Sequence, residues 1–120
     1  MNPHSIPLVP FQQVFQQLQL FLEEFFKLLV QEEVVMKRLN RENMSAVVEH
    51  KETVLEKIQR SEQQLIAVLR PWISRESAAD CWKVITQDSR FADVRQLPAF
   101  QALQRETARI CVQSEKNYVV

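Results

Sequence analysis

The feature that most constrains this sequence is a pair of long apolar series separated by four polar residues. The first series runs through Phe11, Phe15, Leu18, Leu22, Phe25, Leu29, Glu32, Met36 and Leu39, in alternating steps of four and three residues. The second runs through Met44, Val48, Lys51, Leu55, Ile58, Glu62, Leu65 and Leu69 with the same steps. This spacing is typical of an apolar seam along an α-helix. The sequence therefore predicts two long helices.

The polar segment between the two series, residues 40–43, has an asparagine at each end. Asparagine tolerates the left-handed conformation that often ends a helix, and it is also a good N-cap. We therefore expect a short turn and an antiparallel hairpin. A further series, Val14, Phe21, Leu28 and Val35, widens the apolar face of the first helix. More than one neighbouring element must cover a face of that width.

Reflecting the chain about the turn predicts which residues of the two helices face each other. The apolar pairs are Leu39 with Met44, Val35 with Val48, Leu28 with Leu55, and Phe25 with Ile58. The same reflection places Glu32 opposite Lys51, and each is a charged interruption of its seam. We predict an ion pair between them. It either fixes the register of the helices or offers a polar contact to a bound partner.

The rest of the sequence extends this hairpin into an all-α, elongated bundle of one domain. Residues 1–9 hold Pro3 and Pro7 and predict an extended arm, and the hairpin occupies residues 10–70. Residues 71–97 predict a short helix, with Ser77 or Ser74 as its N-cap, and a polar connector. Residues 98–120 predict a second shorter, amphipathic helix that frays beyond Glu115 and leaves Asn117 and Tyr118 mobile.

The composition excludes several functions. The 120 residues include no glycine, which phosphate-binding loops, dinucleotide fingerprints and nucleophile elbows require. Fifteen basic residues balance fifteen acidic ones, which argues against a nucleic-acid or anionic-membrane partner. Two cysteines favour a reduced, cytoplasmic chain, and neither a signal-peptide pattern nor a transmembrane segment is visible.

Residues with catalytic potential do not form a recognisable motif. His4 lies in the proline arm, His50 has no metal-ligand partner at helical spacing, and Cys81 has no histidine near it in sequence. The adjacent glutamates of the first helix point in different directions. We therefore expect no enzyme activity, no metal and no cofactor. Apolar surface that two short helices leave uncovered would instead bind a partner.

The block FKLLVQEEVVMKRLNRENMSAVVEHKETVLEKIQRSEQQL resembles the signature of FlgN-type flagellar export chaperones, and the likeness extends over about Phe11 to Leu69. Glu32 and Lys51 fall on the glutamate and lysine of that signature. The resemblance implies a cytoplasmic chaperone of a type III secretion apparatus. Such a protein binds hook–filament junction proteins by their helical termini, prevents their premature assembly and delivers them to the export gate.

The resemblance also implies roles for residues in the C-terminal segment. Members of this family look like helical hairpins with a mobile, amphipathic C-terminal segment that binds the client, which makes Phe100, Leu103 and Ile110 the candidate client contacts. Tyr118 occupies a place comparable to the tyrosine that docks at the export gate. The alternative is a homodimeric coiled-coil scaffold or adaptor, in which two hairpins pair through the wide face of the first helix. The client, the oligomeric state and the docking of the C-terminal helix stay open at this point.

Overall fold

The computed structural model describes residues 6–73 and 77–118, and every regular element within them is helical. Two helices of 29 residues, α1 (Val9–Lys37) and α2 (Arg41–Leu69), form the hairpin. They are followed by α3 (Ala78–Gln87), a 3-10 turn η1 (Ser89–Phe91), the four-residue α4 (Ala92–Arg95) and α5 (Pro98–Tyr118). The molecule measures 59 × 20 × 20 Å. The predicted all-α, elongated bundle is confirmed.

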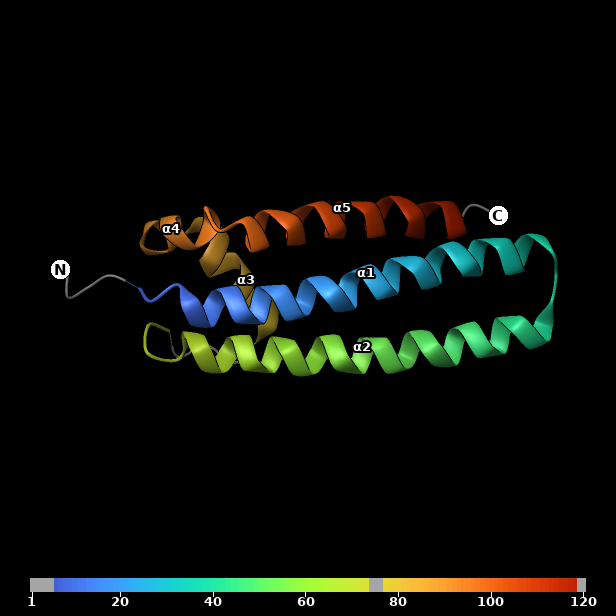
Figure 1. Cartoon of the computed structure of the whole chain (residues 1–120), viewed down its shortest axis with the longest axis horizontal. Helices are drawn as coiled ribbons and strands as arrows, with labels where there is room; N and C mark the ends of the chain where they lie inside the picture. The colour runs from blue at the N-terminus through green and yellow to red at the C-terminus, as the bar shows by residue number, and fades with distance from the viewer. Residues whose placement is uncertain (1–5, 74–76, 119–120) are drawn as a thin grey trace.

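Helix α1 lies at the centre of this arrangement, between α2 on one side and α5 on the other (Figure 1). Helix α2 runs antiparallel to α1, whereas α5 runs parallel to it (Figure 1). At the end of the bundle where α1 begins, the segment from α3 to α4 carries the chain across from α2 to α5 (Figure 1). The wide apolar face of α1 is therefore covered from two sides, as its breadth required. Helix α4, inside the predicted connector, was not expected.

The main core lies at the end of the bundle near α3, and aromatic rings dominate it. Phe11 has no exposed surface, and its ring lies 6.0–6.1 Å from the rings of Phe15, Trp72 and Phe91. Phe15, also fully buried, lies 5.5 Å from Phe100 and stacks on Trp82 at 5.9 Å. These contacts join α1 to the segment that follows α2, to α3, to η1 and to α5. Burial of rings of this size is the largest apolar contribution to stability that a chain of this length has available.

The turn between α1 and α2 corrects one detail of the prediction. Asn40 is the N-cap of α2, as expected, and its Oδ1 accepts a hydrogen bond from the backbone N–H of Asn43 at 3.2 Å. The left-handed residue, however, is Leu39, with φ 53°, and not an asparagine. Leu39 is 87% exposed, so it does not pair with Met44 in the seam. The left-handed conformation costs a leucine about 1–2 kcal/mol, which the two packed helices offset.

Helix α2 also faces α1 differently from the prediction. Its buried positions in the first six turns are Val47, Val54 and Ser61, spaced every seven residues. Val48 and Leu55, the predicted seam residues, remain 39% and 41% exposed. The prediction assumed that one partner helix covers the seam of α1, whereas α2 shares that face with α5. In these turns α2 is rotated accordingly, and its predicted seam lies at the edge of the contact. In the last turns of α2 the predicted seam residues Leu65 and Leu69 are fully buried.

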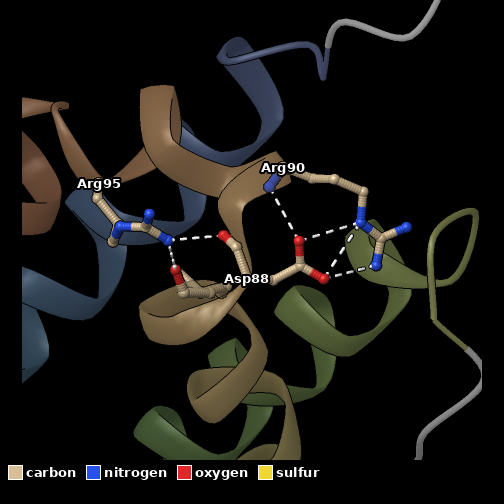
Figure 2. Close-up of polar contacts among 4 residues, drawn as sticks. Asp88, Arg90 and Arg95 are labelled. Atoms are coloured by element: carbon tan, nitrogen blue, oxygen red, sulfur yellow. Dashed lines mark hydrogen bonds and ion pairs between the residues drawn. The ribbon is translucent and has the colours of Figure 1, made fainter.

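The junction after α3 is held by an aspartate and two arginines (Figure 2). Arg95 Nη1 donates to the carbonyl oxygens of Ile85 at 2.7 Å and Asp88 at 2.8 Å, which satisfies carbonyls at the end of α3. The Asp88 carboxylate accepts from the side chain and the backbone N–H of Arg90, and these bonds lower the pKa of Asp88. Ser77 is the N-cap of α3 but makes no side-chain capping bond; Ser74 lies outside the described residues.

Candidate functional site: an apolar groove between α2 and α5

An open groove lies between α2 and α5, with α1 as its floor. Its first part is a hollow of about 550 Å³. Leu18 and Leu22 of α1 form the floor, and Ile58 of α2 forms part of one wall. The residues of α5 that line the opposite wall are Phe100, Leu103, Gln104, Thr107 and Ala108. Apolar side chains therefore make up most of a concave surface, which is typical of ligand and peptide grooves.

Helix α3 closes one end of this hollow. Trp82 and Thr86 of α3 line it, and Trp82 Nε1 donates to Glu62 Oε2 of α2 at 2.9 Å. The Trp82 ring also stacks on Phe15 of α1. Helix α3 thus fills the fourth corner of the bundle for the first turns of α1, beside α1, α2 and α5. Beyond Trp82 that corner is open.

A second hollow of about 360 Å³ continues along the same helix faces toward the hairpin turn. Its floor is formed by Phe25, Leu29 and Met36, the next seam positions of α1. Lys51 of α2 and Tyr118 of α5 line its sides. From Leu18 to Met36 the floor spans about 27 Å at 1.5 Å per residue. The groove is therefore long enough for several turns of a helix.

The predicted ion pair crosses the floor of the second hollow. Lys51 Nζ lies 2.8 Å from Glu32 Oε2, and the two side chains are 22% and 13% exposed. Glu32 Oε1 accepts a hydrogen bond from Asn117 Nδ2 at 2.9 Å, and the same nitrogen donates to the Leu29 carbonyl at 2.9 Å. We call the contacts of Glu32, Lys51 and Asn117 the three-helix junction, because they tie α1 to both α2 and α5. The expectation that the last helix frays beyond Glu115 is wrong, because α5 extends to Tyr118 and includes Asn117. Residues 119 and 120 lie outside the described residues.

The candidate client contacts lie on a docked helix. Phe100 and Leu103 are only 3% and 5% exposed, because they pack in the aromatic core and present one edge to the groove. Ile110 is half-buried. Tyr118 is 90% exposed. Sequence reasoning missed the remaining groove residues, among them Leu22, Ile58 and Trp82. The sequence did carry one signal for them: the two hairpin helices have more apolar residues than the contact between these helices alone can bury.

The side chains that could act as nucleophiles, acids, bases or metal ligands do not gather in one place among the described residues. Burial, assisted by the Asp80 carboxylate, raises the pKa of the Cys81 thiol, which keeps it protonated and weakly nucleophilic. His50 Nε2 lies 3.6 Å from Glu24 Oε1 on the exposed surface. Within residues 6–73 and 77–118 no three potential metal ligands gather. None of the helices described there combines the length and the apolar character that crossing a membrane requires.

Comparison with known proteins found no matching family model, no similar curated protein and no similar solved structure. The geometry of the groove and the sequence signature around Glu32 and Lys51 are therefore the grounds for a functional proposal.

Proposed function

We propose that this protein is an export chaperone of the FlgN type that holds an amphipathic helix of its client in the groove between α2 and α5. The observation that carries the proposal is the open fourth corner of the bundle. Leu18, Leu22 and Ile58 line it, and a helix laid there would cover the surface that the half-buried Leu22 and Ile58 still expose. Such a helix would complete a four-helix packing, in which apolar stripes from all members meet at the centre.

The identity of the client rests on the sequence resemblance. The order of Glu32, turn and Lys51 resembles the family signature, and this supports hook–filament junction proteins as clients and the cytoplasm as the place of action. In this proposal the exposed Tyr118 docks at the export gate. Binding would rely on a few apolar anchors, because much of the groove lining is uncharged.

The alternative, a scaffold that dimerises through the wide face of the first helix, has less surface available. Helices α2 and α5 both pack on α1 and cover most of that face. The apolar floor that stays open lies at the bottom of the groove. A second copy would have to enter the groove as a helix, as a client would, and sedimentation at several protein concentrations separates these cases.

The test is calorimetric titration of the protein with helical C-terminal peptides of hook–filament junction proteins. Ala108 is exposed and lines the groove, so Ala108→Arg places a long charged side chain where the peptide would lie. We expect it to weaken binding at least tenfold, or about 1.4 kcal/mol. Ala67→Arg is the matched control, because Ala67 is exposed on α2 and does not line the groove. Equal affinity of both variants, or no binding to any junction-protein peptide by the folded protein, would overturn the proposal.

A further inference from the structure

We infer that the groove selects a helix that carries a cation near its N-terminus and a carboxylate about three turns later, bound with its N-terminus toward α3. This inference rests on the proposed function and names the chemistry of the helix that the groove accepts. Its grounds are the opposite charges at the two ends of the groove, their spacing, and the bonds these charged groups already make.

Glu62 supplies the negative charge at the α3 end. Its side chain lines the first hollow and is half-buried. Oε2 accepts the Trp82 indole N–H at 2.9 Å, which fixes the carboxylate beside the groove. Among the described residues no lysine, arginine or histidine forms an ion pair with Glu62. A partner cation can therefore bind this carboxylate without displacing an existing ion pair.

Lys51, whose charge is paired with Glu32, supplies a cationic hydrogen-bond donor at the end near the hairpin turn. An ammonium group has three N–H donors, and Lys51 directs one to Glu32 Oε2. Both oxygens of Glu32 are engaged, since Oε1 accepts from Asn117. Ser114 and Tyr118, which carry hydroxyl groups, line the same hollow. The spare donors of Lys51 and these hydroxyls favour an acceptor, and a carboxylate makes the strongest bond with an ammonium.

The spacing of the two charges sets the spacing in the partner. Lys51 and Glu62 are separated by 62 − 51 = 11 residues on α2, about 17 Å along its axis. Residues 11 apart also lie on one face of a straight helix, because 11 residues make about three turns. The floor between the charges is apolar: Leu22, Phe25 and Leu29. The partner helix therefore presents apolar residues between its cation and its carboxylate.

The direction of the partner follows from its own dipole. The N-terminus of a helix carries partial positive charge and its C-terminus partial negative charge. Placing the N-terminus near Glu62 and the C-terminus near Lys51 makes both ends favourable. The bound helix then runs parallel to α1 and α5 and antiparallel to α2.

A double-mutant cycle with designed peptides tests the inference. The first peptide is an 18-residue amphipathic helix with leucines at the inward positions, Lys on the N-terminal flank and Glu 11 residues later. Two further peptides carry Gln in place of either the Lys or the Glu. The protein variants are Glu62→Gln, which retains an acceptor for Trp82, and Lys51→Gln, which retains a donor for Glu32. Comparing the same peptides on each variant cancels differences in peptide helicity.

The peptide with Lys on its N-terminal flank should bind about threefold more tightly than the peptide with Gln there, both to the unchanged protein and to the Lys51→Gln variant. The Glu62→Gln variant should not distinguish these two peptides. The peptide with Glu on its C-terminal flank should likewise bind about threefold more tightly than the peptide with Gln there, and only the Lys51→Gln variant should lose this difference. Coupling of the Lys flank to Lys51→Gln would overturn the assigned direction. Equal binding of all peptides to all variants would overturn this inference and leave the proposed function standing. No binding by any peptide, together with no binding by junction-protein peptides, would overturn both.

Two measurements keep the test decisive. Circular dichroism melts establish that each variant is folded. If Lys51→Gln unfolds, Ser114→Asp replaces it, because a carboxylate beside Lys51 removes the preference for the Glu flank while Glu32, Lys51 and Asn117 are all retained. Alkylation of Cys111 gives a second readout: this exposed cysteine lies four residues after Thr107 and three before Ser114, and a bound helix should slow its modification.

Discussion

The two ends of the bundle are held together by different means. At the α3 end, Phe11 and Phe15 are fully buried among aromatic rings contributed by several segments. At the hairpin-turn end, α1 is joined to its neighbours by carboxylates that accept from Lys51, Gln113 and Asn117. Leu39, at the turn itself, is almost wholly exposed.

The difference shows that apolar burial at one end of α1 can supply most of the stability, while polar contacts at the other end set the register of the neighbouring helices. Burying an aromatic side chain contributes several kcal/mol, whereas a net hydrogen bond contributes about 1 kcal/mol. Polar contacts, however, are satisfied only in one register, whereas apolar contacts tolerate small shifts. The turn end therefore determines which residues of α2 and α5 face the groove. The following predictions, from the largest effect to the smallest, test this division.

Removing the Phe11 ring should have the largest effect. Phe11 contacts three other rings and is fully buried, so Phe11→Ala leaves a cavity in the core. We expect the free energy of unfolding to fall by about 3–5 kcal/mol, measured by urea denaturation. Leu20→Ala on the exposed surface of the same helix is the control and should change it by less than about 0.5 kcal/mol. A loss below about 1 kcal/mol for Phe11→Ala would contradict the assignment of the core to this end.

Removing one partner of the ion pair should have an intermediate effect. Lys51→Ala leaves the largely buried Glu32 carboxylate without its cation, and we expect a loss of about 1–3 kcal/mol. The double variant Glu32→Leu with Lys51→Leu should lose less, because apolar side chains fit the seam and leave no charge unpaired. Melting temperatures of the two variants make the comparison. A double variant less stable than Lys51→Ala would show that the pair itself contributes net stability.

Acid should loosen the turn end selectively, as the smallest effect. Glu33 accepts from Gln113 of α5 and from Lys37 at 3.0 Å, and these bonds lower the pKa of Glu33. A lowered folded-state pKa stabilises the fold above the ordinary glutamate pKa, and this contribution disappears as pH falls through the folded-state value. Amide protection factors in the last two turns of α5 should therefore decrease as the pH falls below the ordinary glutamate pKa of 4.5.

A matched variant isolates Glu33 from the other carboxylates. Asp88 at the opposite end also has a lowered pKa, so global stability cannot separate the two sites. Glu33→Gln should flatten the pH dependence in the last turns of α5 and leave the protection near Asp88 unchanged. Identical pH profiles for Glu33→Gln and the unchanged protein would contradict the role given to Glu33.

The heptads were sufficient to predict the hairpin, its turn and the Glu32–Lys51 pair, because each depends on spacing within residues 11–69. The same spacing predicted the buried Leu65 and Leu69 near the end of α2, but not the face that is buried in its earlier turns. That face depends on α5, which lies beside α1 although Asn117 is 85 residues beyond Glu32 in the chain. The burial of Val47 instead of its neighbour Val48 depends on how α1, α2 and α5 pack together, and not on the spacing of apolar residues within α2.

The groove was predicted only in part. Unburied apolar surface followed from the width of the seam, and Phe100 and Leu103, which the resemblance named as client contacts, line the groove. The role of Trp82 as the end of the groove had no signal, because helix α3 has the same amphipathic pattern whichever corner of the bundle it fills. The ordered Asn117 was also missed, since its partners, Glu32 and the Leu29 carbonyl, become neighbours only after α5 has docked.

The parallel course of α5 has a consequence for the order of folding. Lys51 and Glu32 close a segment of 19 residues, whereas Asn117 and Glu32 close one of 85. The entropy of closing the longer loop is about 1 kcal/mol less favourable, so the hairpin gains its contacts sooner and α5 joins it afterward. The groove has two of its sides in the early hairpin and acquires its third only in the last step. Under the proposed function, a newly made chain would hold a client helix there only when folding is complete.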